Sequence, residues 1–239
     1  MEYLVLISSI ALAALTYFGF GLQDARHVKL LNAFTGAYLL SLTVLHLLPE
    51  LYHVHDHDGG NSALLIGSLI LTGFFVQIAL DAISLGVEHG HSHVVKGRGV
   101  WGVVVGLCLH ALLEASALGH SHSHHDVESR RLLLWSIVVH NFPVSIALLG
   151  MLMQSGMKRA TALWILTLFA VMAPLGMFIS AHTDLAHHSR ALMAVVIGIF
   201  MHISTTILFE SSDGHRFNFA KLAAIAVGTV VGVASVLMH

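Results

Sequence analysis

Residues 63–87 have the sequence ALLIGSLILTGFFVQIALDAISLGV, an apolar stretch of 25 residues that carries a single charged side chain, Asp81. An α-helix rises by about 1.5 Å per residue, so about 20 apolar residues are enough to cross the hydrocarbon core of a bilayer. A surface helix of a soluble protein would instead carry one polar face along its whole length. The stretch therefore predicts a transmembrane helix.

Seven further stretches of similar length and composition lie on either side of this one. They cover residues 3–22, 30–51, 99–119, 132–154, 160–181, 191–209 and 218–238. The segments between them are short and hold nearly all the charged residues, which leaves no room for a soluble domain. We therefore expect an all-α, polytopic membrane protein of about eight helices, with one transmembrane domain over residues 1–239.

The composition agrees with this class of protein. Hydrophobic residues make up 56% of the 239 residues and charged residues only 10%. In soluble domains about a quarter of the residues are charged. The net charge of -2 argues against a nucleic-acid partner, which would require a basic surface. Cys108 is the only cysteine, so no intramolecular disulfide can form. The lipid bilayer is the expected partner.

The distribution of Lys and Arg predicts the orientation. Segments that follow the first, third, fifth and seventh stretches hold eight such residues, and those on the other side hold three. The eight are Arg26, Lys29, Lys96, Arg98, Lys158, Arg159, Arg216 and Lys221, and the three are Arg130, Arg131 and Arg190. Because short cytoplasmic loops are enriched in positive charge, we expect both termini to be extracytoplasmic.

The chain contains 20 histidines, and most fall in clusters between the apolar stretches. The predicted extracytoplasmic face carries His53, His55, His57, His120, His122, His124, His125, His182, His187 and His188, and the cytoplasmic face carries His89, His91 and His93. Neutral imidazole is a good ligand for ions such as zinc, so these tracts are expected to collect metal. Solvated polar loops and a pH-sensitive surface are the alternatives.

The fourth stretch contains LHALLEASALG at residues 109–119, with His110 and Glu114 close to the middle of the predicted span. Ionisable groups at this depth are costly and require a partner or a function. Residues four apart share one face of a helix, so both side chains can reach the same ion. The alternative is a hydrogen-bonded pair that joins two helices.

The fifth stretch repeats this pattern as VHNFPVSIAL at residues 139–148. His140 occupies the position of His110, and Val144 occupies that of Glu114. Pro143 lacks a backbone N–H, which predicts a kink beside His140. Interrupted helices at mid-membrane are common in the ion sites of transporters.

Three other polar positions occur within the apolar stretches. His46 lies near the extracytoplasmic end of the second stretch and His202 deep in the seventh, and both are candidate metal ligands. An interfacial histidine is the alternative for His46. Asp81 and Gln77 share one face of the third stretch, where Asp81 is either a ligand or a hydrogen-bonding anchor between helices.

Several of these motifs resemble the ZIP family of divalent metal transporters over nearly the whole chain. The similar segments are GAYL at 36–39, HLLPE at 46–50, GFF at 73–75, EHGH at 88–91, the two histidine-centred stretches, PLG at 174–176 and GIF at 198–200. The resemblance implies eight helices with extracytoplasmic termini. It also implies transport toward the cytoplasm of zinc or, in some members, iron, manganese or cadmium.

The resemblance implies metal ligation by His110 and Glu114 in the fourth helix, by His140 in the fifth and by His46 in the second. Three positions depart from the family pattern: Ala111 replaces a common asparagine, Val144 a usual glutamate and Ala173 a carboxylate of some members. A second metal ion would need these oxygen ligands. The departures therefore imply a one-metal site between helices four and five.

The leading hypothesis is a secondary transporter for Zn²⁺, with other divalent metals as further cargo and no enzymatic activity. Three imidazole nitrogens and one carboxylate oxygen suit four-coordinate zinc. The GxxxxGK[ST] loop of ATP-driven pumps is absent from the sequence. The alternatives are a membrane-embedded, ceramidase-like zinc hydrolase, and a metal sensor or buffer that binds without transport. We expect a plasma or inner membrane location and leave a homodimer open.

Overall fold

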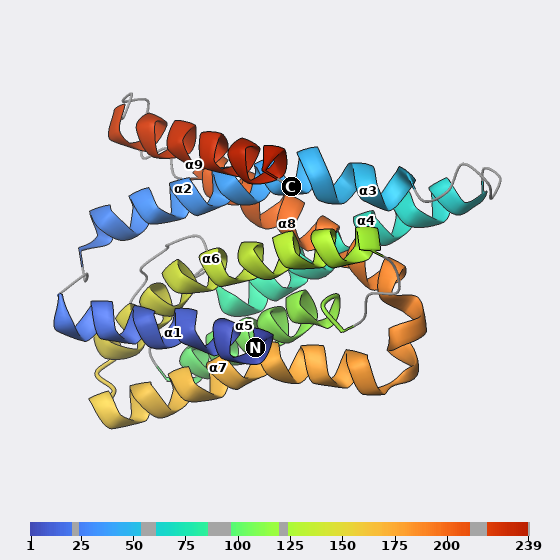
Figure 1. The fold of residues 1–239 in the computed structure, drawn as a ribbon. Helices are drawn as coiled ribbons and strands as arrows, with labels where there is room; N and C mark the ends of the chain where they lie inside the picture. The colour runs from blue at the N-terminus through green and yellow to red at the C-terminus, as the bar shows by residue number, and fades with distance from the viewer. Residues whose placement is uncertain (21–23, 54–60, 86–96, 120–123, 211–218, 239) are drawn as a thin grey trace.

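The computed structural model describes residues 1–239 apart from 21–23, 54–60, 86–96, 120–123, 211–218 and 239 (Figure 1). All the regular elements in the described ranges are helices. In chain order they are α1 (Glu2–Gly19), α2 (Ala25–Leu42), the π-helical turn η1 (Thr43–Leu47), α3 (Leu48–His53), α4 (Asn61–Ser84), α5 (Arg98–Ser116), α6 (His124–Gln154), α7 (Arg159–His182), the 3-10 turn η3 (Asp184–His188), α8 (Ser189–Glu210) and α9 (Phe219–Leu237).

Eight helical segments of the described chain are long and apolar enough to cross a membrane. They include α4, from which the prediction began, and their bounds differ from the predicted ones by a few residues. The second span is composite, because α2, η1 and α3 follow one another without a break over Arg26–Tyr52. The predicted eight-helix membrane protein is confirmed, whereas the orientation of its termini stays a prediction.

The distribution of side chains is the reverse of that in a soluble protein. Large apolar side chains such as Leu64, Trp164 and Phe209 are among the most exposed in the described chain. Polar side chains from several helices are instead buried, and those that bear on the site are Gln77, His110, Glu114, His140 and Asn141. Exposed apolar surface on this scale is stable against lipid tails and not against water.

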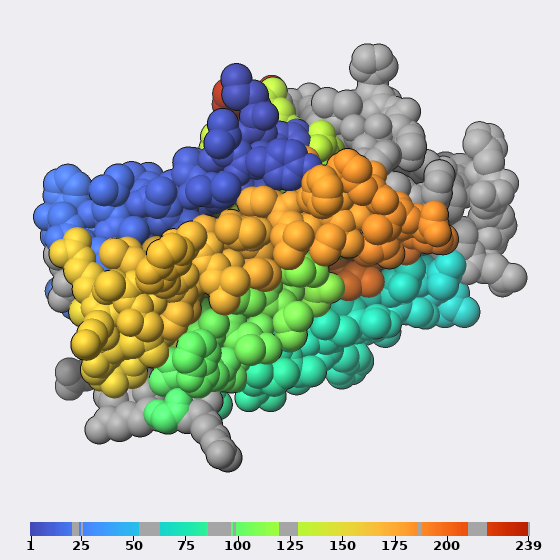
Figure 2. All heavy atoms as spheres, turned by 90° about the horizontal axis from the view of Figure 1, so that it is seen from below, coloured from blue at the N-terminus to red at the C-terminus, as the bar shows by residue number. Residues whose placement is uncertain are grey.

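The helices pack as two groups of four that lie side by side (Figure 1). One group, called here the α5 group, contains α1, α5, α6 and α7, with α5 against α7 and α1 against α6. The other, the α4 group, contains α2, α4, α8 and α9, with α4 against α8 and α2 against α9. Seen from below, α7 lies between α1 and α5, and α4 flanks α5 (Figure 2).

Glycines allow the closest helix contacts within each group. A Cβ on Gly176 of α7 would lie 2.1 Å from the carbonyl oxygen of Leu112 on α5, and one on Gly73 of α4 would lie 1.9 Å from that of Val195 on α8. No side chain fits at either place, so the backbones touch directly, as at many helix contacts in membranes. The contact between α5 and α7 fixes the helix that carries His110.

The two groups meet mainly where α4 packs against α5 and α2 against α6. Both α5 and α6 therefore lie on the side of their group that contacts the α4 group. α6 continues as a helix through Pro143, and the predicted kink beside His140 stays a prediction. The histidine tracts predicted between the spans lie largely outside the described residues, although His182 and His188 are described and exposed.

Candidate metal site

His110 and Glu114 face each other along α5 in the interior of the protein. Nε2 of His110 lies 3.0 Å from Oε1 of Glu114, and neither side chain has any exposed surface. This geometry follows from their spacing of four residues, which places them one turn apart on the same helix face. Oε2 of Glu114 has no hydrogen-bond partner among the described residues. A buried carboxylate oxygen in this state is a ready ligand for a cation.

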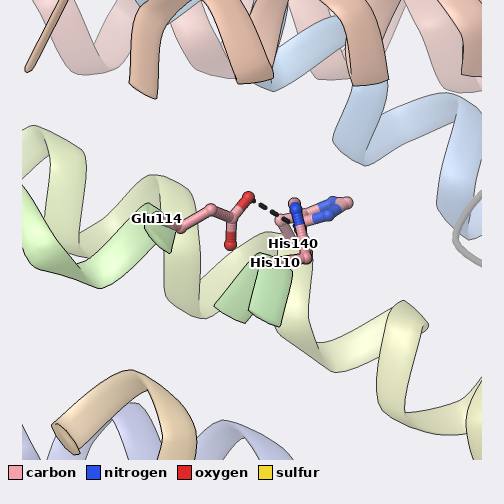
Figure 3. A group of neighbouring side chains, drawn as sticks. All are labelled: His110, Glu114 and His140. Carbon is pink, nitrogen blue, oxygen red and sulfur yellow. Dashed lines mark ion pairs between the residues drawn. The ribbon is translucent and has the colours of Figure 1, made fainter. Parts of the chain in front are cut away.

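His140 of α6 completes the group from the neighbouring helix (Figure 3). Its side chain is fully buried. Its ring centre lies 5.8 Å from that of His110, and the two rings are nearly perpendicular, at 82°. One ligand atom from each of His110, Glu114 and His140 lies within 4.8 Å of the other two, and within the described ranges no other group of three such residues meets this criterion.

These three ligands fit a zinc ion with a small contraction. Zinc binds histidine nitrogen and carboxylate oxygen at about 2.0–2.2 Å in tetrahedral geometry, which places neighbouring ligand atoms about 3.4 Å apart. The His110–Glu114 contact of 3.0 Å is already close to this value. The longest separation, within 4.8 Å, would need to shorten by about 1.4 Å.

The second ring nitrogen of His110 contacts the other helix group. Nδ1 of His110 lies 3.0 Å from Oε1 of Gln77, a fully buried side chain of α4. Nε2 of Gln77 donates to Oδ1 of Asp81 at 3.0 Å, and Oδ2 of Asp81 lies 2.6 Å from Nε2 of His202 on α8. Asp81 therefore joins α4 to α8 by a hydrogen bond, as the anchor alternative expects, and its role as a metal ligand stays a prediction.

The two remaining predicted ligands lie outside the three-residue group. His46 belongs to the π-helical turn η1, and its Nε2 lies 3.0 Å from the hydroxyl oxygen of Ser129 on α6. His202 pairs with Asp81, and its ring lies nearly perpendicular to that of Phe74, with centroids 4.9 Å apart. Their roles as metal ligands stay predictions, because both have contacts of a different kind here.

Three buried neighbours define the remainder of the site. Ala111 and Val144 have no exposed surface and belong to one apolar cluster. Asn141 follows His140 and is also fully buried, and neither its amide nitrogen nor its amide oxygen has a hydrogen-bond partner among the described residues. In the alignment of the two motifs, Asn141 occupies the position of Ala111. Only the structure shows that the amide of Asn141 is buried.

Comparison with known proteins then identifies the family. The sequence profile of the ZIP zinc transporter matches residues 86–237, which contain α5 to α9 and all three residues of the group. The chain belongs to the ZIP family. The resemblance drawn from the motifs is thereby confirmed. The description of that family as zinc transporters favours the transport hypothesis over the hydrolase alternative.

Individual ZIP relatives have low sequence identity to this chain. Zinc transporter ZIP9 of Xenopus tropicalis is 25% identical over 177 residues, which cover 69% of this chain and 58% of the relative. Zinc transporter ZIP9 of Micropogonias undulatus is 24% identical over 174 residues, which cover 68% of this chain and 56% of the relative. This chain thus spans less than three fifths of the length of either relative.

Proposed function

We propose that this chain carries Zn²⁺ across a membrane toward the cytoplasm, through a single-ion site formed by His110, Glu114 and His140 between α5 and α6. Other divalent ions that accept nitrogen and oxygen ligands are secondary cargo. The observation that carries this proposal is the buried group itself: two imidazoles and one carboxylate brought together inside a ZIP-family chain.

The number of protein ligands favours transport over a structural role. Structural zinc sites are closed by four protein ligands, whereas sites that exchange a ligand keep one position open. His110, Glu114 and His140 supply three, so the fourth position is left for water or for a transient ligand along the path. His46 and His202 are candidates for such transient contacts. The name zinc transporter, borne by both relatives, supports zinc as the cargo.

The direction rests on the distribution of charge and histidine. Eight of the eleven Lys and Arg residues fall on one side of the predicted topology, which makes that side cytoplasmic. The larger share of the histidines between the spans then lies on the opposite side, where it would gather zinc before transport. We therefore assign inward movement down the zinc gradient and place the chain in a plasma or inner membrane.

Binding without transport is the second candidate function. It is favoured by the apolar environment of Val144 and Ala111, because the positions that would supply further oxygen ligands are filled by buried hydrocarbon. A buffer or sensor of this kind would bind zinc at the same three residues. Binding measurements alone do not separate it from a transporter, so transport must be measured directly.

The test is zinc uptake by the purified full chain in proteoliposomes loaded with a zinc-sensitive dye. We expect uptake that saturates with external zinc and is lost in His110→Ala, Glu114→Gln and His140→Ala. His27→Ala is the matched control, because this exposed histidine of α2 lies outside the group and outside the histidine tracts. Tight binding to the unmodified protein with no uptake would establish the buffer, and the absence of both binding and uptake would refute the site.

A further inference from the structure

Gln77, a side chain of the α4 group, forms a hydrogen bond with the candidate ligand His110. It has no exposed surface and lies one turn before Asp81 on α4, so both residues share a helix face directed at α5 and α8. The sequence pairs Gln77 with Asp81, but the contact of Gln77 with His110 depends on how α4 packs against α5.

The direction of this hydrogen bond follows from the partner at the other end of the amide. An amide presents one acceptor oxygen and one donor nitrogen, whereas a carboxylate only accepts. Asp81 faces Nε2 of Gln77 at 3.0 Å, so the amide nitrogen must point to Asp81 and the amide oxygen to His110. Nδ1 of His110 is then the donor and carries the ring proton.

Asp81 is itself held in place from α8. Its second oxygen lies 2.6 Å from Nε2 of His202, so both carboxylate oxygens have a donor. The exposed fractions of His202 and Asp81 are only 13% and 16%. A carboxylate held between two donors keeps the amide of Gln77 from rotating by half a turn. The chain of contacts therefore runs from His202 through Asp81 and Gln77 to His110.

We propose that Gln77 is a positioning residue of the metal site: it holds the proton of His110 on Nδ1 and thereby presents the lone pair of Nε2 to the ion. This inference rests on the proposed function, since it assigns Nε2 as the ligand atom of the same site. It adds a residue of the opposite helix group to that site.

The proposal explains why Nε2 of His110 faces Glu114. With the proton on Nδ1, Nε2 and Oε1 of Glu114 are two acceptors 3.0 Å apart. Two acceptors at this distance require a positive centre between them: a shared proton in the metal-free protein and, in the loaded site, a divalent ion bound by both. Without Gln77 the proton can move to Nε2, where Glu114 accepts it. The ligand nitrogen is then occupied by a hydrogen bond.

The first test reads the tautomer directly in metal-free protein. Nitrogen-15 spectra of the histidine-labelled full chain in lipid nanodiscs report which ring nitrogen carries the proton, and His110→Asn identifies the His110 signal by its loss. We expect the Nδ1–H form in the unmodified protein and the Nε2–H form in Gln77→Leu. Gln77→Glu keeps an acceptor opposite Nδ1 and should restore the original form.

The second test measures zinc affinity in the same variants. Removing a residue that orients a metal-binding histidine weakens affinity by about 10- to 100-fold, and we expect this loss in Gln77→Leu. Ser204→Ala is the matched control, because among the described residues this buried hydroxyl of α8 donates to carbonyls of its own helix. Asp81→Asn, which frees the amide of Gln77, should give a mixture of tautomers and serves as the second variant should Gln77→Leu not fold.

The outcomes separate this proposal from the proposed function. An unchanged Nδ1–H signal in both Gln77→Leu and Asp81→Asn overturns the role of Gln77, even where zinc binds normally. An equal loss of affinity in Ser204→Ala does the same, since it would reflect general loosening of the core. Failure of the unmodified chain to bind zinc refutes the proposed function and leaves the tautomer measurement as an independent test of Gln77.

Discussion

Val144→Glu tests the single-ion proposal most sharply. Val144 lies one turn after His140 on α6, as Glu114 lies one turn after His110 on α5, and it has no exposed surface. At an effective dielectric constant of about 20, two dications about 4 Å apart repel each other by about 17 kcal/mol. A carboxylate oxygen about 2.2 Å from a dication attracts it by about 15 kcal/mol.

The repulsion between the ions and the attraction to the carboxylate nearly cancel for a second ion that shares Glu114 with the first. The unmodified protein should therefore hold one zinc ion. A carboxylate at position 144 adds about 15 kcal/mol of attraction. This exceeds the small net repulsion left between the two ions, even after part of the attraction is lost to desolvation. We therefore expect Val144→Glu to bind two zinc ions, or one far more tightly. Without metal, the buried unpaired charge should lower the free energy of unfolding by about 3–5 kcal/mol.

The assay is calorimetric titration of purified protein together with its metal content by mass spectrometry, with thermal unfolding recorded in the presence and absence of zinc. Val144→Gln is the control, because it has the size of glutamate without its charge. Two well-occupied ions in the unmodified protein would contradict the electrostatic argument. So would equal stoichiometry and affinity in the Glu and Gln variants.

Three further predictions follow from the same site. Replacing His110 or Glu114 by Ala should abolish tight intramembrane zinc binding in a protein that still folds, because the span that carries them stays apolar. Unchanged affinity in both variants would show that the two residues do not share an ion. Uptake at low zinc should weaken, and uptake at saturating zinc should persist, when the histidines between the spans are changed to Ser, since they raise local supply without forming the path; a lower maximal rate at constant half-saturation would contradict this. The set to change is His53, His55, His57, His120, His122, His124 and His125. Zinc affinity should also fall as the pH drops through about 6.5, because a protonated imidazole has no lone pair for the ion; constant affinity from pH 8 to pH 5, measured by competition with a chelator, would exclude a histidine-dominated site.

The sequence by itself determined the membrane architecture and, through helix geometry, two of the three residues of the candidate site. Apolar runs of about 20 residues are a local property, so the eight spans could be located without knowing how they pack. The pairing of His110 with Glu114 was equally local, because a helix places residues four apart on one face whatever surrounds it. The same reasoning joined Gln77 to Asp81 on α4.

Only the tertiary structure decided which helices bring their polar residues together. His140 joins His110, whereas His46 contacts Ser129 and His202 pairs with Asp81, although all three histidines were candidate ligands in the sequence. The contact of Gln77 with His110 likewise depends on the rotation and register of α4 against α5. These quantities are set by packing over whole helix faces, including backbone contacts such as that of Gly176 with Leu112. A pattern within one helix carries no information about its rotation against the next.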